Sequence, residues 1–385
     1  MSKAPKISCL FGAAAVLAAV VVPAASAAGP KVGRLVVVGD SLSAGFENFS
    51  LYDTAQQQGY PALIAKQAGV KLTLPLISQP GIPPMLELKP DGSIVRADSI
   101  GGRENPGDQP FNLSVPAFTL ANAFAYTASS PTTNPIDALA ATILGQPACG
   151  VVGGTPQAPI VSEITCALRL QPDTIIVSLG NNDALQSLTF GVPPTDVNTF
   201  RVQYSLLIAA LRSTGARLVL GNVPDVSSLP FLVPVPVVQA ICGAIPPGAG
   251  PTDYVVPDIT SPNPSICTSN QVRSAVLISQ TRAAIVAYNN TIASFGVMPN
   301  VAVADVNALF ANAAAHGYTI GTDTLTTQFL GGLFSLDAIH PTATGQGILA
   351  NLFIDAMDAK FNMKIPHVDL LAIEQADPLA HIPHP

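Results

Sequence analysis

RLVVVGDSLSAG, residues 34–45, is the stretch of the chain that decides its fold. The valine-rich run at 34–38 predicts a short buried strand, and a glycine, an aspartate and a serine follow it directly. Gly39 lets the backbone turn tightly, so that the strand delivers Ser41 to the start of a helix. On its own such a serine is a simple helix cap. Its role therefore depends on which other segments can meet it.

Short apolar strands alternate with helices along the rest of the chain. Further strands are expected at 174–183, 217–225 and 300–306, and helices at 60–69, 117–126, 160–170, 196–214, 270–295 and 343–360. This alternation is typical of a parallel sheet that is covered by helices on both faces. The sequence therefore predicts a three-layer α/β/α domain. In such sheets, sites form beyond the carboxyl ends of the strands.

Polar residues gather where these strands end. The first strand leads to Ser41, the segment GNND at 180–183 supplies Asn182, and the late segment SLDAIHPT carries Asp337 three residues before His340. A serine hydroxyl is a weak nucleophile, so it needs an imidazole to take its proton. The imidazole in turn needs a partner on its other nitrogen. The chain thus supplies a nucleophile, a base with its orienting acid, and an amide that can stabilise an oxyanion.

These segments resemble the GDSL, or SGNH, hydrolase superfamily. Gly39-Asp40-Ser41-Leu42 matches the first block of that family, which holds the nucleophile. The segment GNND matches the block G-x-N-D, which places the oxyanion asparagine of the family on Asn182. The segment DAIHP at 337–341 matches the block D-x-x-H, which holds the acid and the base. The order of the blocks also agrees, and the matched core covers residues 33–360.

The resemblance implies ester hydrolysis through an acyl-enzyme, on a flavodoxin-like parallel sheet. Ser41 attacks the ester, His340 acts as base and then as acid, and Asp337 orients His340. The backbone N–H of Ser41 and the side chain of Asn182 stabilise the oxyanion. No metal or organic cofactor is implied, and three histidines are expected to be solvated in the C-terminal tail: His367, His381 and His384.

The second block of the family departs from the pattern. The family usually has a glycine there, whose backbone N–H joins the oxyanion hole. In NLSVPAFTLAN, residues 112–122, that position falls on Ala117. A backbone N–H survives the change, but the loop must then adopt a conformation that suits alanine. The chain contains no G-x-S-x-G, so the nucleophile elbow of the α/β-hydrolases, the nearest rival fold, is absent.

The composition favours an exported protein. The chain is 48% hydrophobic, but 36 prolines and 30 glycines break up its apolar runs, which argues against membrane-spanning helices. The N-terminus has two lysines, an apolar run and the small-x-small pattern Ala25-Ser26-Ala27, so residues 1–27 are predicted to be a cleaved signal peptide. An uncleaved membrane anchor is the alternative. Removing both lysines changes the formal charge from −7 to −9, and an acidic chain is a poor partner for nucleic acid.

Two disulfides are expected in an exported chain with four remaining cysteines. Three pairings are possible. We favour Cys149 with Cys166 and Cys242 with Cys267, because each pair would staple one Pro/Gly-rich insertion. The cysteine spacing matches no zinc pattern.

The domain organisation and the substrate are inferred together. A single hydrolase domain is expected at 28–365, with apolar, proline-rich insertions near 70–116 and 226–268, followed by a poorly ordered tail at 366–385.

Insertions that border the site would favour an acyl chain over a sugar as the substrate group, although they could equally be packing against the core. The absence of tryptophan also argues against a sugar site.

A secreted or periplasmic lipase or carboxylesterase is therefore the first hypothesis. Its partners would be lipid or small-molecule esters, with transient contact at a lipid interface and no obligate protein partner. Three alternatives remain open: a carbohydrate O-acetylesterase, an acyltransferase or phospholipid-directed enzyme, and a non-catalytic lipid-binding protein on the same scaffold.

Overall fold

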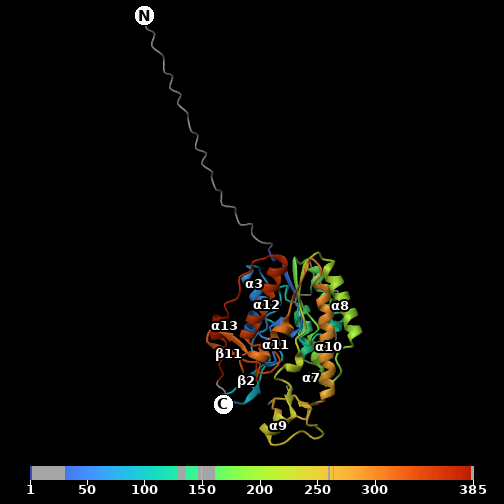
Figure 1. The fold of residues 1–385 in the computed structure, drawn as a ribbon, viewed down its shortest axis with the longest axis vertical. Coiled ribbons are helices and arrows are strands. Elements are labelled where there is room, and N and C mark those ends of the chain that lie inside the picture. Colours follow the sequence, from blue (N-terminus) through green and yellow to red (C-terminus); the bar gives the residue numbers. More distant parts are fainter. Residues whose placement is uncertain are drawn as a thin grey trace.

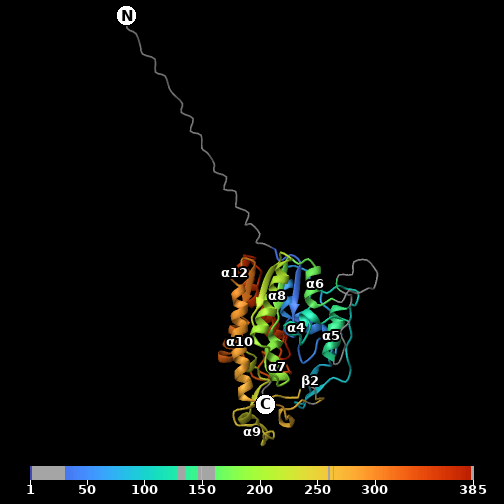
Figure 2. The same ribbon diagram turned by 90° about the vertical axis from the view of Figure 1, so that its right-hand side faces the viewer.

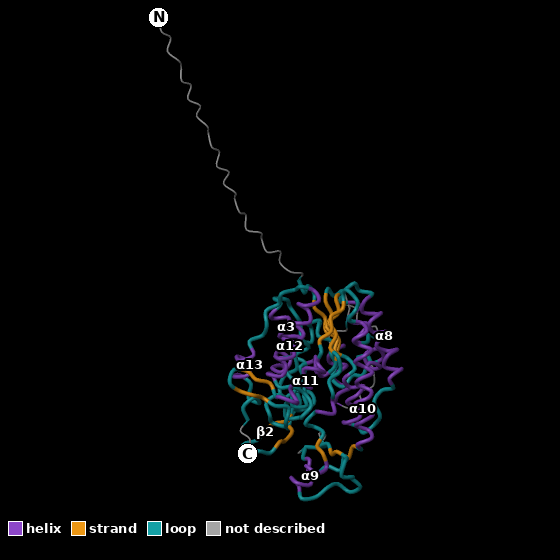
Figure 3. Tube along the Cα trace, viewed as in Figure 1, coloured by secondary structure: helices purple, strands orange, loops and turns teal. Residues whose placement is uncertain are grey.

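A parallel four-stranded sheet forms the centre of the computed structural model, which describes residues 1, 31–128, 135–145, 149, 161–258, 261–262 and 264–382. Its strands lie in the order β1 (Leu35–Gly39), β4 (Thr174–Ser178), β5 (Arg217–Gly221) and β9 (Val301–Ala304). All three strand pairs are parallel. Figure 3 shows these strands between two layers of helices, which confirms the predicted three-layer α/β/α fold.

A fifth segment extends the sheet beyond β1. The amide of Val37 donates to the carbonyl of Phe111, and the amides of Leu113 and Val115 donate back to Val37 and Gly39. The bridge between Val37 and Asn112 is parallel. Counted with this edge segment, the strands take the chain order 2-1-3-4-5, which is the flavodoxin-like order. The expected insertion near 70–116 therefore ends before residue 111, because its last residues belong to the sheet.

The two faces of the sheet are covered by different helices. Val36 and Val38 of β1 point into one buried cluster, while Leu35 and Val37 point into the other, because side chains alternate along a strand. The first cluster packs against α6 (Glu163–Arg169), α7 (Asn181–Thr189), α8 (Val197–Arg212) and α10 (Ala275–Phe295). The second packs against α3 (Tyr60–Gln67) and α12 (Ala343–Phe361), and Figure 1 shows α3 and α12 on one side of the strands and α8 and α10 on the other.

The remaining elements are short. They are α1 (Ser41–Ala44), α2 (Asp53–Gln58), α4 (Leu120–Ala125), α5 (Pro135–Leu144), α9 (Val235–Cys242), α11 (Val306–His316), α13 (Leu370–Ala376), the 3-10 turns at Val226–Ser228 and Ile266–Thr268, and strands β2 (Leu86–Leu88), β3 (Ile94–Arg96), β6 (Val233–Pro234), β7 (Tyr254–Val255), β8 (Val272–Arg273), β10 (Tyr318–Ile320) and β11 (Asp323–Leu325).

Three boundaries differ from the sequence-based expectation. The expected strand at 174–183 ends at Ser178, and Asn182 lies in the first turn of α7 instead of at a strand end. The expected helix at 117–126 begins only at Leu120, because Thr119 caps it in a capping box with Asn122. The expected helix at 270–295 begins at Ala275, after the short strand β8.

The insertion at 226–268 has a structure of its own. Strands β6, β7 and β8 form a small antiparallel sheet, and α9 packs on it through Val235 and Val238. Cys242, at the end of α9, is joined to Cys267. Cys149 is joined to Cys166 on α6. Both favoured disulfide pairings are therefore present, and α9 projects from one end of the molecule in both views (Figures 1 and 2).

The C-terminal segment is not the loose tail that the sequence suggested. Residues 370–376 form α13, which packs on α12. Glu374 and Asp377 are buried. The carboxylate of Asp377 accepts hydrogen bonds from the amide and the hydroxyl of Thr344, at 2.8 and 2.7 Å. These tertiary hydrogen bonds fix a segment whose sequence is rich in proline and polar residues.

Two expectations concern the ends of the chain. The predicted signal peptide, residues 1–27, lies outside the described residues apart from Met1, and so does His384. Within the ranges that the structure describes, no helix is both long enough and apolar enough to cross a bilayer.

Candidate active site

Ser41 lies at the turn between β1 and α1. The side chain of Asp40 caps α1 by accepting a hydrogen bond from the amide of Leu42, at 3.1 Å. Gly39 is required at this turn, because a Cβ there would lie 2.5 Å from the hydroxyl of Ser43. The turn therefore holds the side chain of Ser41 at the carboxyl end of the sheet, where it is 7% exposed.

Asp337 and His340 form a buried pair. Oδ2 of Asp337 lies 2.9 Å from Nδ1 of His340. Oδ1 accepts hydrogen bonds from the amides of Ile339 and His340, at 2.9 and 2.8 Å. Burial alone would raise the pKa of Asp337, but the charge of His340 and these hydrogen bonds hold it below its ordinary value. The carboxylate therefore stays ionised, and it favours the tautomer that carries its proton on Nδ1.

A loop that no sequence motif marks also holds Asp337. The amide of Phe49 donates to Oδ2 of Asp337 at 2.6 Å. Asn48 and Phe49 both have left-handed backbone conformations, with φ of 53° and 57°. The side chain of Asn48 accepts from the amide of Leu336 at 3.0 Å, which ties the two loops together. No motif marks these residues, because their role depends on loop geometry.

The other nitrogen of His340 is available for chemistry. Nε2 is buried and makes no hydrogen bond with any described residue. His340 and Ser41 line the same cavity, which has a volume of about 560 Å³. The ring of His340 packs against Phe46, with centroids 4.8 Å apart. With Nδ1 facing Asp337, the lone pair of Nε2 is left to accept a proton.

Asn182 lines the same cavity, opposite the loop that follows the edge segment. Its amide nitrogen donates to the carbonyl of Phe118 at 3.1 Å. The next residue, Asp183, accepts from the amide of Leu120 at 3.0 Å. The first turn of α7 therefore fixes the position of the loop that carries Ala117, which also lines the cavity.

The backbone conformation at Ala117 differs from the expected one, which was a conformation that suits alanine. Its φ is 65°, in the left-handed region that favours glycine. An L-residue there costs roughly 1–2 kcal/mol. The backbone thus keeps the conformation that a glycine would adopt, and the strain is accepted at a position that faces the cavity.

We expect Ala117→Gly to stabilise the protein. Relief of the strained φ outweighs the extra entropy of glycine in the unfolded chain, so the free energy of unfolding should rise by about 0.5–1 kcal/mol. Urea denaturation followed by circular dichroism measures this. Ala209→Gly, in the interior of α8, is the matched control and should destabilise. Equal losses in the two variants would contradict the strain at Ala117.

Buried carboxyl groups lie beneath the nucleophile. Asp40 accepts from the amide nitrogen of Asn181 at 2.9 Å, and Glu163 accepts from the amide of Gly39 at 2.6 Å. Burial raises the pKa of Asp40 to about 7, although the bond from Asn181 lowers it. Burial also raises the pKa of Glu163 well above its ordinary value. The raised pKa values favour the protonated carboxyls of Asp40 and Glu163, so two negative charges are not placed side by side in this part of the core.

We expect the protein to be more stable at pH 5 than at pH 8. Asp40 has a folded pKa of about 7, and burial raises that of Glu47 to about 8. The folded state keeps protons that the unfolded chain releases above about pH 4. The free energy of unfolding is therefore highest at low pH and falls as the pH rises through 7 to 8. Each group lowers this free energy by up to about 1.4 kcal/mol per pH unit. A Tm that rises from pH 5 to pH 8 would contradict this.

The wall of the cavity comes from both the core and the insertion. Phe46, Phe49 and Phe190 are among its apolar residues. Pro257, next to the small antiparallel sheet, adds to the wall. A volume of about 560 Å³ lies in the range of small-molecule sites. The insertion near 226–268 therefore borders the candidate site, as the acyl-chain hypothesis requires.

Comparison with known proteins finds a matching family. The family model described as GDSL-like Lipase/Acylhydrolase matches residues 35–353. No curated protein matches the chain.

Similar solved structures include LAE5, an alpha/beta hydrolase enzyme from the metagenome of Lake Arreo in Spain, with 13% identity, a TM-score of 0.41 and coverage of 85% of this chain and 95% of that one. A lipase from a goat rumen metagenome has 13% identity, a TM-score of 0.38 and coverage of 84% and 96%. The psychrotrophic esterase EstA from Pseudoalteromonas, inhibited by monoethylphosphonate, has 12% identity, a TM-score of 0.36 and coverage of 85% and 98%.

Proposed function

Because the chain belongs to the GDSL-like lipase/acylhydrolase family and is an ester-hydrolysing serine hydrolase, we propose that Ser41, His340 and Asp337 carry out its reaction. The observation that supports this most is the 2.9 Å contact between Asp337 and Nδ1 of His340. It leaves Nε2 without a hydrogen-bond partner among the described residues, at a cavity that Ser41 also lines. The base, its orienting acid and the hydroxyl are thus gathered at one site.

The reaction proceeds in two halves. Nε2 of His340 takes the proton of Ser41 while its Oγ attacks the ester carbonyl, and His340 then gives the proton to the departing alcohol. This leaves an acyl group on Ser41. A water molecule, deprotonated by His340, attacks the acyl-enzyme and releases the acid. Asp337 stabilises the imidazolium in both halves.

The developing oxyanion is stabilised by the backbone N–H groups of Ser41 and Ala117 and by the side chain of Asn182. These donors come from three segments that meet at the cavity, which supports the proposal. The bond from Asn182 to the carbonyl of Phe118 uses one of its two amide hydrogens and leaves the other for substrate.

We expect Asn182→Ala to lower kcat by roughly 10²–10³, because one oxyanion donor is lost. KM should change little. Steady-state kinetics on a soluble p-nitrophenyl ester measures both constants. Asn198→Ala, on the exposed start of α8 and far from the cavity lining, is the control and should leave kcat unchanged. An unchanged kcat in Asn182→Ala would remove this side chain from the mechanism.

The substrate that we propose is an ester with a medium or long acyl chain. Aromatic and aliphatic side chains dominate the cavity, and burying each methylene of a chain contributes about 0.8 kcal/mol. Hydrolysis of p-nitrophenyl esters from acetate to palmitate tests this. A maximum at medium or long chains supports a lipase or carboxylesterase. Activity confined to acetate would favour the O-acetylesterase, and acyl transfer to an added alcohol in competition with water would favour the acyltransferase.

We also propose that the protein is exported to the periplasm or the medium. The N-terminal pattern and the two disulfides support this, because disulfides persist in oxidising compartments. Mass spectrometry of the protein recovered from the producing cells would show an N-terminus near residue 28. An intact Met1 on the functional protein would contradict it.

A further inference from the structure

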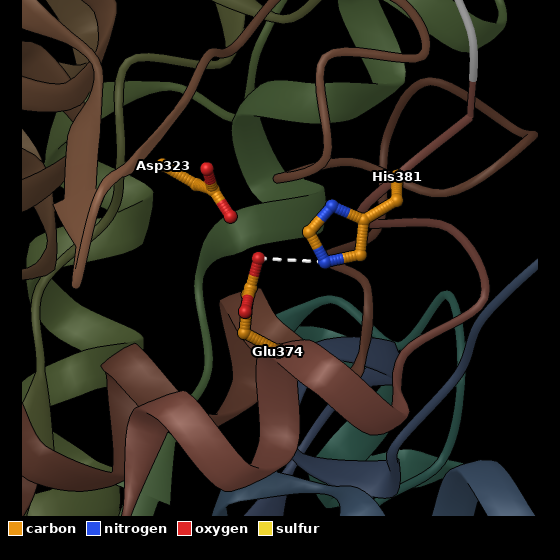
Figure 4. Close-up of side chains that lie close together, drawn as sticks. All are labelled: Asp323, Glu374 and His381. Atoms are coloured by element: carbon orange, nitrogen blue, oxygen red, sulfur yellow. Dashed lines mark ion pairs between the residues drawn. The ribbon is translucent and has the colours of Figure 1, made fainter.

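Three side chains of metal-binding type meet away from the candidate active site. Asp323 begins β11, Glu374 lies on α13, and His381 lies in the segment that follows α13. Their ligand atoms, two carboxylate oxygens and a ring nitrogen, all lie within 4.8 Å of one another. Figure 4 shows the three groups pointing into one common space from three separate segments.

Glu374 is the buried member of this cluster. It is 1% exposed, and its Oε1 makes no hydrogen bond with any described residue. Nε2 of His381 lies 2.7 Å from this oxygen as an ion pair, which Figure 4 marks with a dashed line. Buried carboxylate oxygens are normally hydrogen-bonded. The oxygen and the nitrogen therefore lie side by side without the geometry of a donor and its acceptor.

A second histidine of the same region provides the contrast. Nε2 of His367 also lies 2.7 Å from a carboxylate oxygen, that of Asp355, and this contact is both an ion pair and a hydrogen bond. Both partners there are exposed, and no third ligand joins them. An ordinary surface pair thus reaches good hydrogen-bond geometry in this protein, whereas the pair of His381 and Glu374 does not.

We propose that Asp323, Glu374 and His381 bind one divalent transition-metal ion, with zinc the preferred ion. One imidazole nitrogen and two carboxylate oxygens are a suitable set of zinc ligands. Ligand atoms around zinc lie about 3–3.5 Å apart, so the exposed side chain of Asp323 must move closer, and Nε2 of His381 must move slightly away from Oε1 of Glu374. The ion would lie between Oε1 of Glu374 and Nε2 of His381, which now face each other directly.

The ion would secure the segment that supports the start of α12. Asp377, three residues after Glu374, holds the amide and hydroxyl of Thr344 in the first turn of that helix. Thr344 lies four residues after His340. A clamp between β11, α13 and His381 would therefore stabilise the fold on the side of the loop that carries the candidate base.

Titration of the metal-free, full-length protein with zinc chloride in a calorimeter tests the site. We expect one saturable equivalent and a Tm that rises until that equivalent is bound. His381→Ala should lose the saturable binding and the rise in Tm, and Asp323→Asn should weaken them. His367→Ala is the matched control and should keep the binding and the rise in Tm. Absence of saturable binding in the natural protein, or equal binding in His381→Ala, would overturn the proposal.

A different observation concerns Arg273, which lines the cavity that contains Ser41. The residue is 6% exposed, and its guanidinium donates to the carbonyls of Leu188, Thr189 and Val272 and to the side chain of Gln271. These bonds cap the end of α7 and fix the group. One of its five N–H donors has no acceptor among the described residues.

This buried cation also lacks a counter-ion among the described residues. It forms no ion pair with any of them, and burial lowers its pKa. Buried charges in proteins are normally paired. An anion in the cavity would supply the missing charge.

We infer that Arg273 is a subsite for an anionic group, a carboxylate or a phosphate, on the ester substrate. The inference rests on the proposed function. Arg273 bonds to Thr189 at the end of α7, and Asn182 lies in the first turn, so the anion would lie about 10 Å along the helix from the oxyanion hole. Arginine is the side chain best suited to such groups.

Matched ester pairs test the subsite on the unmodified enzyme. We expect p-nitrophenyl monoesters of medium-length dicarboxylic acids to have a kcat/KM about 10–100-fold above that of their methyl-capped neutral analogues. A second pair, a monoacylglycerol with and without a phosphate, tests whether the subsite binds an anion on the alcohol side of the ester instead of the acyl side. Arg273→Gln should remove the preference while neutral esters are still hydrolysed.

The outcomes separate this inference from the proposed function. Equal rates on charged and neutral esters, or a preference that persists in Arg273→Gln, would overturn the subsite alone. Absence of Ser41-dependent hydrolysis on every ester would instead overturn the proposed function. The comparison on the unmodified enzyme decides the question even if Arg273→Gln does not fold.

Discussion

Ser41→Ala is expected to abolish ester hydrolysis and to leave the fold intact. The side chain at the end of β1 is small and lines the cavity, and its hydroxyl makes no hydrogen bond with another described residue. Alanine cannot form the acyl-enzyme, and loss of the serine in triad hydrolases lowers kcat about 10⁶-fold. Steady-state hydrolysis of a p-nitrophenyl ester measures the loss, and circular dichroism checks the fold.

The control for this variant comes from the same short helix. Ser43→Ala removes a buried hydroxyl that bonds to Tyr60 at 2.8 Å but does not line the cavity. It should cost about 1 kcal/mol of stability and leave kcat close to that of the natural protein. A fluorophosphonate probe should label the natural protein and Ser43→Ala at Ser41, and should not label Ser41→Ala. Labelling of Ser41→Ala would place the nucleophile elsewhere.

Asp337→Asn is expected to lower kcat by about 10⁴-fold, the effect of this change in a Ser-His-Asp triad. The carboxylate accepts four donors: the amides of Phe49, Ile339 and His340, and Nδ1 of His340. The amide group of an asparagine would have to present N–H to some of these donors. Where it faces the ring, His340 must carry its proton on Nε2, and it can then no longer accept the proton of Ser41.

Measurement of kcat and KM for Asp337→Asn tests this role. KM should stay within a few-fold, because Asp337 does not line the cavity and does not touch the substrate. Asp355→Asn is the matched control: it changes another carboxylate paired with a histidine, but one that is exposed and far from the cavity lining. A kcat within tenfold of the natural value in Asp337→Asn would show that another group orients His340.

Much of the fold followed from local pattern. The valine-rich strands of the sheet were all expected, because residues buried on both sides of a parallel sheet give short apolar runs. The long helices α8, α10 and α12 correspond to the helices expected at 196–214, 270–295 and 343–360. The edge segment at 111–115 was missed, since its strand is a single bridge with irregular chain on both sides.

The short helices were less accessible to prediction. The sequence pattern predicts the end of a strand where α7 begins, because GNND has no apolar period and the helical start is set by the left-handed Gly180. For α13 the pattern predicts a loose tail. The hydrogen bonds between Asp377 and Thr344, which bring together residues 33 apart in sequence, hold that segment in place.

The sequence by itself determined the chemical types at the candidate site and their order along the chain. The sequence identifies the hydroxyl, the amide, the carboxylate and the imidazole directly, because each group is the side chain of one residue type. Tertiary structure alone decided what surrounds them: the strained φ of Ala117, the amide of Phe49 on Asp337, and the unpaired Arg273 in the cavity wall. These features arise from contacts between residues far apart in sequence, so no local pattern records them.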